Sequence, residues 1–341
     1  MAKPKLEDVA AVAGVSPTTV SRVLNNRGYI SSKTRNKVQS AMQQINYRPN
    51  AIARSLQEQK THLIGLVFPT VANPFYGELA YRIESKLADA GYKVILCNSE
   101  DHPELEARYL DMLLGNQVDG VITGAHSDVV ANSPHLDAPL VTIDRVKTGK
   151  YPNIRSDNYD GALQASETLL AGGAKNIVHF TSTISATNLR QRGYRDALKA
   201  AGVEPRIVEL GFKTSNTSQE EAISNYLNNH PEVDAVFASN DTYAALALQW
   251  ATLKGRSIPD DFQVIGFDGT GVVRTLLPHL ATVVQPLDLV ALRAVDRLLA
   301  AVNGKATSFD SAQADSAEQA ADILPVQIHY GSSVRRSRVL S

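Results

Sequence analysis

The sequence predicts an α/β protein, with an N-terminal all-α helix-turn-helix head and a two-lobed body of doubly wound parallel sheets. Three observations lead to this prediction. Residues 6–25 contain two short amphipathic helices joined by a turn. From Leu63 onward, apolar runs alternate with amphipathic helices, as in parallel α/β sheets. The chain of 341 residues is also too long for one ordinary core, so two or three compact units are expected.

Residues 6–25 carry the pattern of the head. Apolar residues at positions 6, 9, 10 and 13 form one face of the first helix, and Gly14 suits the left-handed residue that ends it. Ser16 is a good N-cap for the second helix. The outward face of this helix is short, polar and basic, and consists of Thr18, Thr19, Ser21 and Arg22. Such a face suits the major groove of DNA, although an ordinary helical hairpin with solvated threonines shares the pattern.

The charge distribution favours the DNA-binding interpretation. The formal net charge of the whole chain is -1. Residues 1–60 nevertheless hold ten Lys or Arg and three acids, a net charge of +7, which leaves a net charge of -8 for the remainder. A basic head on an acidic body is typical of a DNA-binding module carried by a regulatory domain.

A third helix and a linker follow. Ser31 or Ser32 is predicted to cap the third helix, and Pro49 disfavours helix at Arg48. Residues 50–60 would form about two helical turns, which are too short to be stable alone in water. Arg54 and Leu56 favour a helix that forms when docked, and the alternative is a plain linker. We therefore expect a head at 1–48, a hinge at 49–61 and a body at 62–341.

The body pattern predicts two lobes. Predicted strands cover residues 64–68, 94–97, 120–123, 140–143, 177–180, 207–210, 235–238, 264–267 and, as a last strand, 324–330. The chain is expected to cross to the second lobe near 156–158 and to return near 282–286, a hinge geometry that closes on a ligand. Lobe one would hold 62–156 and 285–330, and lobe two 157–284. Residues 304–322, rich in Ala, Ser, Asp and Gln, are expected to form an exposed loop.

Several classes of protein are disfavoured. The single cysteine, Cys97, excludes an intrachain disulfide framework, and its apolar neighbours favour a buried structural thiol. The N-terminus lacks the apolar region of a secretory signal, and there is no run of about 18 apolar residues for a membrane span, so we expect a cytoplasmic protein. We find no dinucleotide fingerprint, P-loop, zinc-site spacing or nucleophile elbow, so neither catalysis nor a cofactor or metal is expected.

Polar residues follow the predicted strands of the body. The carboxyl ends of strands are where open α/β sheets bind ligands. Carboxylates and a guanidinium there suit the paired hydroxyls of a sugar, and an aromatic ring suits its apolar face. Each residue alone is equally consistent with a helix cap or a salt bridge. The candidates for an effector site are Asn73, Phe75, Asp144, Arg190, Asn240, Asp241 and Asp268.

Several motifs in register resemble the lactose-repressor family of bacterial transcription regulators over nearly the whole chain. They are LEDVAAVAGVSPTTVSRVLN, NYRPNAIARSL, LIGLVFPTVANPFYGEL, RQRGY, SNDTYAALAL and VIGFDGT. The runs NPFYGEL, VILCNSED and NQVDGVI look most similar to the sucrose-operon repressors of this family. The resemblance implies a periplasmic-binding-protein-like body and no enzymatic activity.

The resemblance also implies roles for individual residues. In the head, Pro17, Thr18 and Arg22 match base-reading positions, where an Arg typically binds guanine. Positions that contact phosphates or the DNA backbone are matched by Ser16, Thr19, Ser21, Asn25, Ser31, Thr34, Tyr47 and Asn50. Ala53 and Leu56 match the hinge helix, with Arg54 beside them, and Leu56 would be the wedge that kinks the minor groove. In the body, Phe75, Asp144, Arg190, Asn240 and Asp268 match effector-pocket positions.

The leading hypothesis is a homodimeric repressor of a carbohydrate-utilisation operon. It would bind a pseudo-palindromic double-stranded operator and respond to a small sugar effector, with sucrose or a related sugar favoured. The alternatives are a sugar-binding receptor of periplasmic type with an accessory head, which would need a signal peptide, and a sugar-modifying enzyme, which would need turnover. No leucine-heptad tail follows the body, so a dimer is expected rather than a tetramer.

Overall fold

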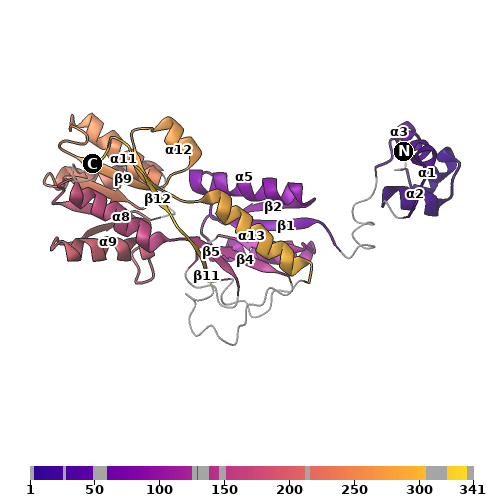
Figure 1. Cartoon of the computed structure of the whole chain (residues 1–341), viewed down its shortest axis with the longest axis horizontal. Coiled ribbons are helices and arrows are strands. Elements are labelled where there is room, and N and C mark those ends of the chain that lie inside the picture. Colours follow the sequence, from indigo (N-terminus) through magenta and orange to yellow (C-terminus); the bar gives the residue numbers. More distant parts are fainter. Residues whose placement is uncertain are drawn as a thin grey trace. The chain divides into compact units, whose positions relative to one another are not determined.

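The computed structural model describes residues 4–25, 28–48, 60–124, 129, 138–145, 151–211, 216–304 and 321–335. The chain divides into two compact units, Met1–Thr61 and His62–Ser341. Both are drawn in Figure 1. The predicted hinge helix, with Asn50, Ala53, Arg54 and Leu56, lies outside the described residues. Residues 305–320 of the predicted loop also lie outside them.

The head is a three-helix unit that contains the predicted helix-turn-helix. Its helices are α1 (Leu6–Ala13), α2 (Pro17–Leu24) and α3 (Ser32–Gln44). Gly14 ends α1 in the left-handed conformation, at φ 63°, and Ser16 and Ser31 are the N-caps of α2 and α3. The apolar faces of the three helices meet in a small core of Val9, Ala10, Ala13, Val20, Val23, Val38 and Ala41.

The first lobe of the body is built on a parallel six-stranded sheet. In the order in which they pair, its strands are β11 (Ala321–Leu324), β5 (Asn153–Ser156), β4 (Leu140–Ile143), β3 (Gly120–Thr123), β1 (Leu63–Phe68) and β2 (Lys93–Asn98). Helices α5 (Pro74–Asp89) and α13 (Leu287–Val302) lie side by side over this lobe (Figure 1) and share one apolar core with the sheet. Helix α6 (Pro103–Gly115) contributes to a second core with the strands.

The second lobe also has a six-stranded sheet. Its strands, in pairing order, are β12 (Gln327–His329), β10 (Ala281–Val284), β9 (Gln263–Asp268), β8 (Ala235–Ala238), β6 (Ile177–Thr181) and β7 (Arg206–Glu209). Helices α8 (Asn158–Ala171) and α9 (Leu189–Ala200) share one core with the sheet, and α10 (Asn216–Asn229) and α11 (Asp241–Leu253) share another. The short α12 (Gly271–Leu276) follows β9. The predicted doubly wound α/β architecture is confirmed.

Three connections join the lobes, whereas the sequence predicted two. The chain passes from β5 into α8 of the second lobe, and from β10 back into α13 of the first. The prediction of a single last strand at 324–330 in the first lobe is wrong. Pro325 interrupts that run, so β11 ends at Leu324 in the first sheet and β12 pairs antiparallel with β10 in the second. The segments that contain β5 and β10 were predicted as crossings, and both also form strands.

A hydrogen bond from helix to helix joins the lobes beside these connections. The backbone N–H of Gly271, the first residue of α12, donates to the Glu78 carboxylate on α5 at 2.7 Å. Glu78 also accepts hydrogen bonds from Arg82, whose guanidinium lies 2.7 Å from Asp288 at the start of α13. An acidic side chain at a helix N-terminus is favourable, because the unpaired N–H groups there carry partial positive charge.

The described helices include none that combines the length and the apolar character needed to span a membrane.

Candidate functional site

The outward face of α2 is the first candidate site. Pro17, Thr18 and Arg22 are exposed on this helix, while Val20 and Val23 on its opposite face are buried. The Pro17 ring stands in the first turn, where the missing backbone N–H breaks no helical bond. The three predicted base-reading residues are therefore brought together on one accessible surface.

The predicted phosphate-contacting residues lie mainly at helix termini. The Ser16 hydroxyl accepts a hydrogen bond from the Thr19 backbone N–H at 3.1 Å, and Ser31 accepts one from Thr34 at 3.3 Å. These caps fix the N-termini of α2 and α3, where backbone donors and partial positive charge suit anions such as phosphate. Asn25 donates to Ser21 at the C-terminal end of α2, at 3.4 Å.

Two tyrosines of the head differ in their surroundings. Tyr47 packs partly buried against the head core, and burial, together with the nearby Glu7 charge, raises the pKa of its hydroxyl. Tyr29, which the sequence pattern did not single out, is 98% exposed. A single exposed aromatic side chain is common on protein surfaces and carries no functional signal by itself.

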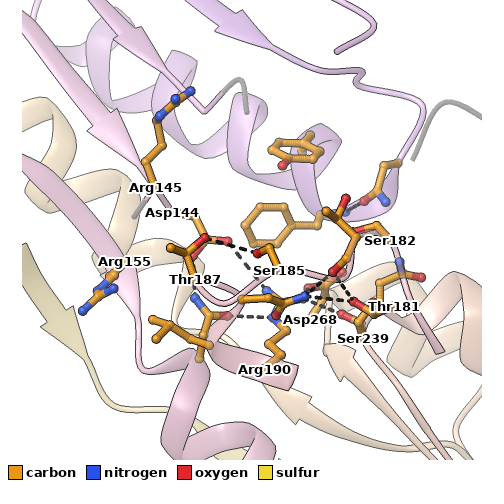
Figure 2. A pocket seen from close by; sticks show the side chains of 18 of the residues that line it. Asp144, Arg145, Arg155, Thr181, Ser182, Ser185, Thr187, Arg190, Ser239 and Asp268 are labelled. Atoms are coloured by element: carbon orange, nitrogen blue, oxygen red, sulfur yellow. Dashed lines mark hydrogen bonds and ion pairs between the residues drawn. The ribbon is translucent and has the colours of Figure 1, made fainter. Parts of the chain in front are cut away.

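The second candidate site is a cavity of about 490 Å³ in the body, here called the body pocket. Its walls come from both lobes, as the strand-end argument predicted. Of the seven predicted effector residues, six line it: Asn73, Phe75, Asp144, Arg190, Asn240 and Asp268. Figure 2 shows Asp144, Arg190 and Asp268 close together at its centre.

Helix N-termini place several of these side chains. Asn73 caps α5 by accepting the Phe75 backbone N–H at 2.9 Å, and Asn240 caps α11 by accepting the Tyr243 N–H at 2.9 Å. Arg190 is in the first turn of α9, after the N-cap Asn188. Because these helices follow parallel strands, their N-termini collect at the carboxyl edges of the sheets, where the body pocket lies.

Arg190 connects the polar groups of the pocket. Its Nε donates to Asn158 Oδ1 at 2.7 Å, and its Nη1 donates to the Ser239 backbone carbonyl and lies 3.4 Å from Asp268 Oδ1. Its Nη2 lies 3.7 Å from Asp144 Oδ2, and its guanidinium stacks on the Phe267 ring. A planar guanidinium with five donors is suited to hold several acceptors in a fixed arrangement.

Two of the carboxylates that line the pocket stand on unusual backbone. Asp144 has φ 53° and Asp268 has φ 111°, which are uncommon for residues other than glycine. Such conformations persist where the surrounding structure fixes them, and they gather at ligand sites. Asp144 is fixed by the Asn158 amide, which donates to it at 2.5 Å, and Asp268 by Gln285, which donates at 2.8 Å.

Asp241, the seventh predicted effector residue, is buried beneath the pocket and does not line it. Its carboxylate accepts the Gly269 N–H at 2.8 Å and the Thr282 hydroxyl at 2.5 Å. Gly269 follows Asp268 in a tight turn: it has φ 59°, and a side chain there would meet Val284. By accepting the Gly269 N–H, Asp241 supports the turn that presents Asp268. Its place next to Asn240 in the sequence suggested a pocket role, but the first helical turn directs it inward.

Burial governs the titration of this acidic pair. Burial raises the pKa of both Asp241 and Asp268 well above the ordinary value, and repulsion by the Asp241 charge raises the pKa of Asp268 further. The Arg190 guanidinium acts in the opposite direction on both groups. The Tyr76 hydroxyl on the pocket wall is fully buried, and its pKa is also raised, first by burial and then by Asp144.

The other lining residues were not among the seven predicted effector residues. They include Tyr76, Asp101, Arg145, Arg155, Asn158, Ser239 and the hydroxyl-rich run Thr181, Ser182, Thr183, Ser185, Thr187 and Asn188. The run follows β6, so the strand-end rule applied to TSTISATN could have found it. Arg155 lies within a strand that was not predicted, and no sequence signal marked it.

The pocket is suited to bind a hydroxylated ligand. Its carboxylates can accept hydrogen bonds from the ligand, its guanidinium and amide groups can donate them, and the Phe75 ring offers an apolar surface. Among the described residues no cluster of three His, Cys, Asp or Glu could hold a metal ion.

Comparison with known proteins agrees with both candidate sites. Residues 5–50 match the bacterial regulatory proteins of the lacI family, and residues 61–321 match the periplasmic binding proteins and sugar binding domain of that family. The sucrose operon repressor of Pediococcus pentosaceus is 42% identical over 312 residues, which cover 91% of this chain and 95% of that protein. The sucrose operon repressor of Streptococcus mutans is 38% identical over 97% of this chain and 99% of that protein.

Among solved structures, the lac repressor dimer bound to operator and the anti-inducer ONPF has a TM-score of 0.81 at 27% identity. The match covers 100% of both chains. Because the family models and the relatives named above are regulatory proteins, the expectation of a regulatory protein rather than an enzyme is confirmed. This chain belongs to the lacI family of bacterial regulatory proteins, with a helix-turn-helix head and a sugar-binding body.

Proposed function

We propose that this protein is the repressor of a carbohydrate-utilisation operon, and that it binds its operator as a homodimer and releases it when a sugar fills the body pocket. The observation that carries the proposal is the presence, in one chain, of an exposed basic reading face on α2 and a polar pocket whose walls come from two lobes. The first suits DNA and the second suits a ligand that controls lobe closure.

In the head, we assign base reading to Thr18 and Arg22, with Pro17 as an apolar neighbour that could contact a thymine methyl. Backbone contacts are assigned to Ser16, Thr19, Ser21, Asn25, Ser31, Thr34, Tyr47 and Asn50. The exposed position of Arg22 and the capped N-termini of α2 and α3 support this division.

The segment 49–61 is proposed to join head to body as a hinge helix that forms on the operator. Ala53 and Arg54 would lie along the minor groove, and Leu56 would be inserted between base pairs as a wedge. Pairing of two such helices across a pseudo-palindrome requires a dimer. A protein that binds operator DNA in a bacterium is proposed to act in the cytoplasm.

In the body, the effector is proposed to be a small sugar held by Asp144, Arg190 and Asp268, with Phe75 against a ring face. Asn73 and Asn240 supply amide groups at the pocket edge. Sucrose or a related sugar is favoured, because the two sucrose operon repressors named above are similar to this chain over more than nine-tenths of its length.

A binding assay tests the proposal. Full-length protein is titrated against labelled DNA from upstream of its own and neighbouring sugar genes, with and without a panel of sugars. We expect specific retardation that at least one sugar reduces. Absence of retardation with all upstream fragments contradicts the operator assignment, and retardation that no sugar or sugar derivative alters contradicts the effector assignment.

A further inference from the structure

Arg155 is a buried cation in the body pocket that the proposed contacts do not use. Arg155 is only 6% exposed, and it lies on β5 among the residues that line the cavity. Its Nε is buried and has no hydrogen-bond partner in the described part of the chain. A buried cationic N–H without a partner loses its hydration and gains nothing in return, so such groups are rare unless a ligand or an acid completes them.

The acids nearest to Arg155 along the sheet are engaged elsewhere. Asp144, at the end of the adjacent strand β4, accepts from Asn158 at 2.5 Å and pairs with Arg190. On the other side, β11 places Ile323 opposite Arg155, and its neighbour Asp322 lies 3.3 Å from Arg297. Neither of these carboxylates neutralises the Arg155 guanidinium.

The pocket is polarised along its length. In Figure 2, Arg145 and Arg155 lie on one side of the central group of Asp144 and Arg190, and Thr181 and Ser182 lie on the other. Arg145 is also buried, at 5% exposure, and it takes part in interactions of its own. Arg155 therefore leaves an unsatisfied cationic N–H on one side of the pocket, and hydroxyl groups line much of the rest, as a ligand with an anionic group on a polyhydroxyl body requires.

The three carboxyl groups that line the pocket do not pair with Arg155. Asp144 is already paired with Arg190, and burial favours the neutral form of Asp268. Among the described residues, no hydrogen bond or ion pair joins Asp101 to the buried Nε of Arg155. The anion that Arg155 lacks is then most directly supplied by the ligand, because planar guanidinium groups bind phosphate and carboxylate oxygens in a fork-like geometry.

We infer that the sugar bound in the body pocket carries an anionic group, either a phosphate ester or a carboxylate, and that Arg155 binds this group. The inference rests on the proposed sugar-responsive function and adds the chemical class of the effector. Arg190 contacts residues of both lobes and binds the sugar hydroxyls, and Arg155 gives the charged derivative a higher affinity than its uncharged parent.

Calorimetric titration of the full chain tests the inference. The probes are sucrose, fructose and glucose, their 6-phosphates, gluconate as a sugar acid, and inorganic phosphate. We expect one charged sugar to bind about 10- to 100-fold more tightly than its uncharged parent, the range expected for one hydrogen-bonded charge pair. Tighter binding of a 6-phosphate identifies the group as phosphate, and tighter binding of gluconate identifies it as carboxylate.

Variants at the same position separate binding from folding. Arg155→Met is expected to keep or raise the melting temperature of the unliganded protein, because an unpaired buried charge is removed. It should lose about 10- to 100-fold in affinity for the charged sugar and leave the uncharged parent nearly unaffected. Arg155→Lys should retain part of the preference. The matched control is Arg206→Gln, which removes a half-exposed arginine paired with Glu232 in the second lobe.

The outcomes distinguish this inference from the proposed function. An uncharged sugar that binds as tightly as its charged derivatives, and lowers operator affinity, overturns the inference and leaves the function standing. If Arg155→Met loses affinity equally for charged and uncharged sugars, Arg155 has a structural role, and the inference is again overturned. Failure of every probe to bind overturns the sugar-responsive function itself, and the inference with it.

Discussion

Arg190 Nη2 lies 3.7 Å from Asp144 Oδ2, and these two residues belong to different lobes. Asp144 directly follows β4 of the first sheet, whereas Arg190 is in the first turn of α9 in the second lobe. Any rotation that separates the lobes must lengthen this ion pair, and a ligand that bridges the two residues opposes the rotation. The pocket chemistry and the relative position of the lobes are therefore linked through one contact.

Replacement of Arg190 should strongly weaken effector binding. Arg190→Gln removes the charge shared by Asp144 and Asp268, and truncating a buried charged partner typically costs about 2 kcal/mol or more, equivalent to about 30-fold in effector affinity. Calorimetry with the effector and operator titration should show weak sugar binding and normal DNA binding. Arg192→Gln, an exposed position on the same helix, is the control. Unchanged sugar affinity in Arg190→Gln would remove this residue from the site.

Replacement of Arg22 should weaken operator binding selectively. Arg22→Ala is expected to cost about 1–3 kcal/mol on the specific operator and to relax its sequence preference, because a base contact is lost. Lys33→Ala, also exposed on the head, should weaken specific and scrambled DNA alike and reduce the salt dependence by about one charge. Fluorescence anisotropy with both DNAs measures the difference, and the same loss on both DNAs in Arg22→Ala would make it a phosphate contact.

Loss of the α2 cap should destabilise the head locally. Ser16→Ala leaves the Thr19 N–H without its side-chain acceptor, which costs about 1 kcal/mol of helix stability. Hydrogen exchange of the α2 amides in the full chain should then speed up about fivefold, while amides of the body exchange as before. Ser40→Ala, exposed in the middle of α3, should leave exchange unchanged or slower, because alanine is the better helix former.

The buried Asp268 should make stability fall as pH rises. Burial raises the pKa of its carboxyl in the folded state, so between the ordinary carboxyl range near pH 4 and the raised value, the folded protein binds a proton that the unfolded chain does not. The free energy of unfolding therefore decreases with pH across that window. Asp241, whose pKa is raised in the same way, adds to the trend.

Asp268→Asn tests this pH dependence, because the amide cannot ionise. Between pH 5 and pH 8, denaturant unfolding should show a smaller decrease in the free energy of unfolding for the variant than for the wild type. The stability of the variant relative to the wild type should therefore increase as pH rises. Asp296→Asn, exposed on α13, serves as the control and should follow the wild type. Parallel pH profiles for wild type and Asp268→Asn would show that Asp268 ionises normally in the fold.

Sequence periodicity predicted the head and most strands because each element depends on its own residues. Gly14, Ser16 and the apolar stripe of α2 determine local structure directly. The strands β5 and β10 were predicted as crossings. The residues of β5, NIRS, lack the continuous apolar run by which the other four-residue strands were predicted. The division of 324–330 between two sheets depends on which edge each half meets, and no local pattern reports that.

The candidate site was predictable for residues at or just after the end of a strand. Asp144, Asn240 and Asp268 follow strands, and parallel strands bring their carboxyl ends together. The inward position of Asp241 and the lining position of Arg155 depend on helix phase and on strand pairing respectively. Both are properties of the assembled sheets, so composition and spacing could not supply them.

The coupling between operator and effector distinguishes a ligand-controlled repressor from a protein whose head and pocket are independent. Sugar affinity of the full chain is measured by calorimetry with and without saturating operator DNA, and operator affinity is measured with and without saturating sugar. Linkage requires that the two ligands weaken each other by the same factor, about 5- to 150-fold for typical allosteric proteins. We predict equal factors within this range. Sugar affinity that is identical in the presence and absence of operator would contradict the account, because head and pocket would then act independently.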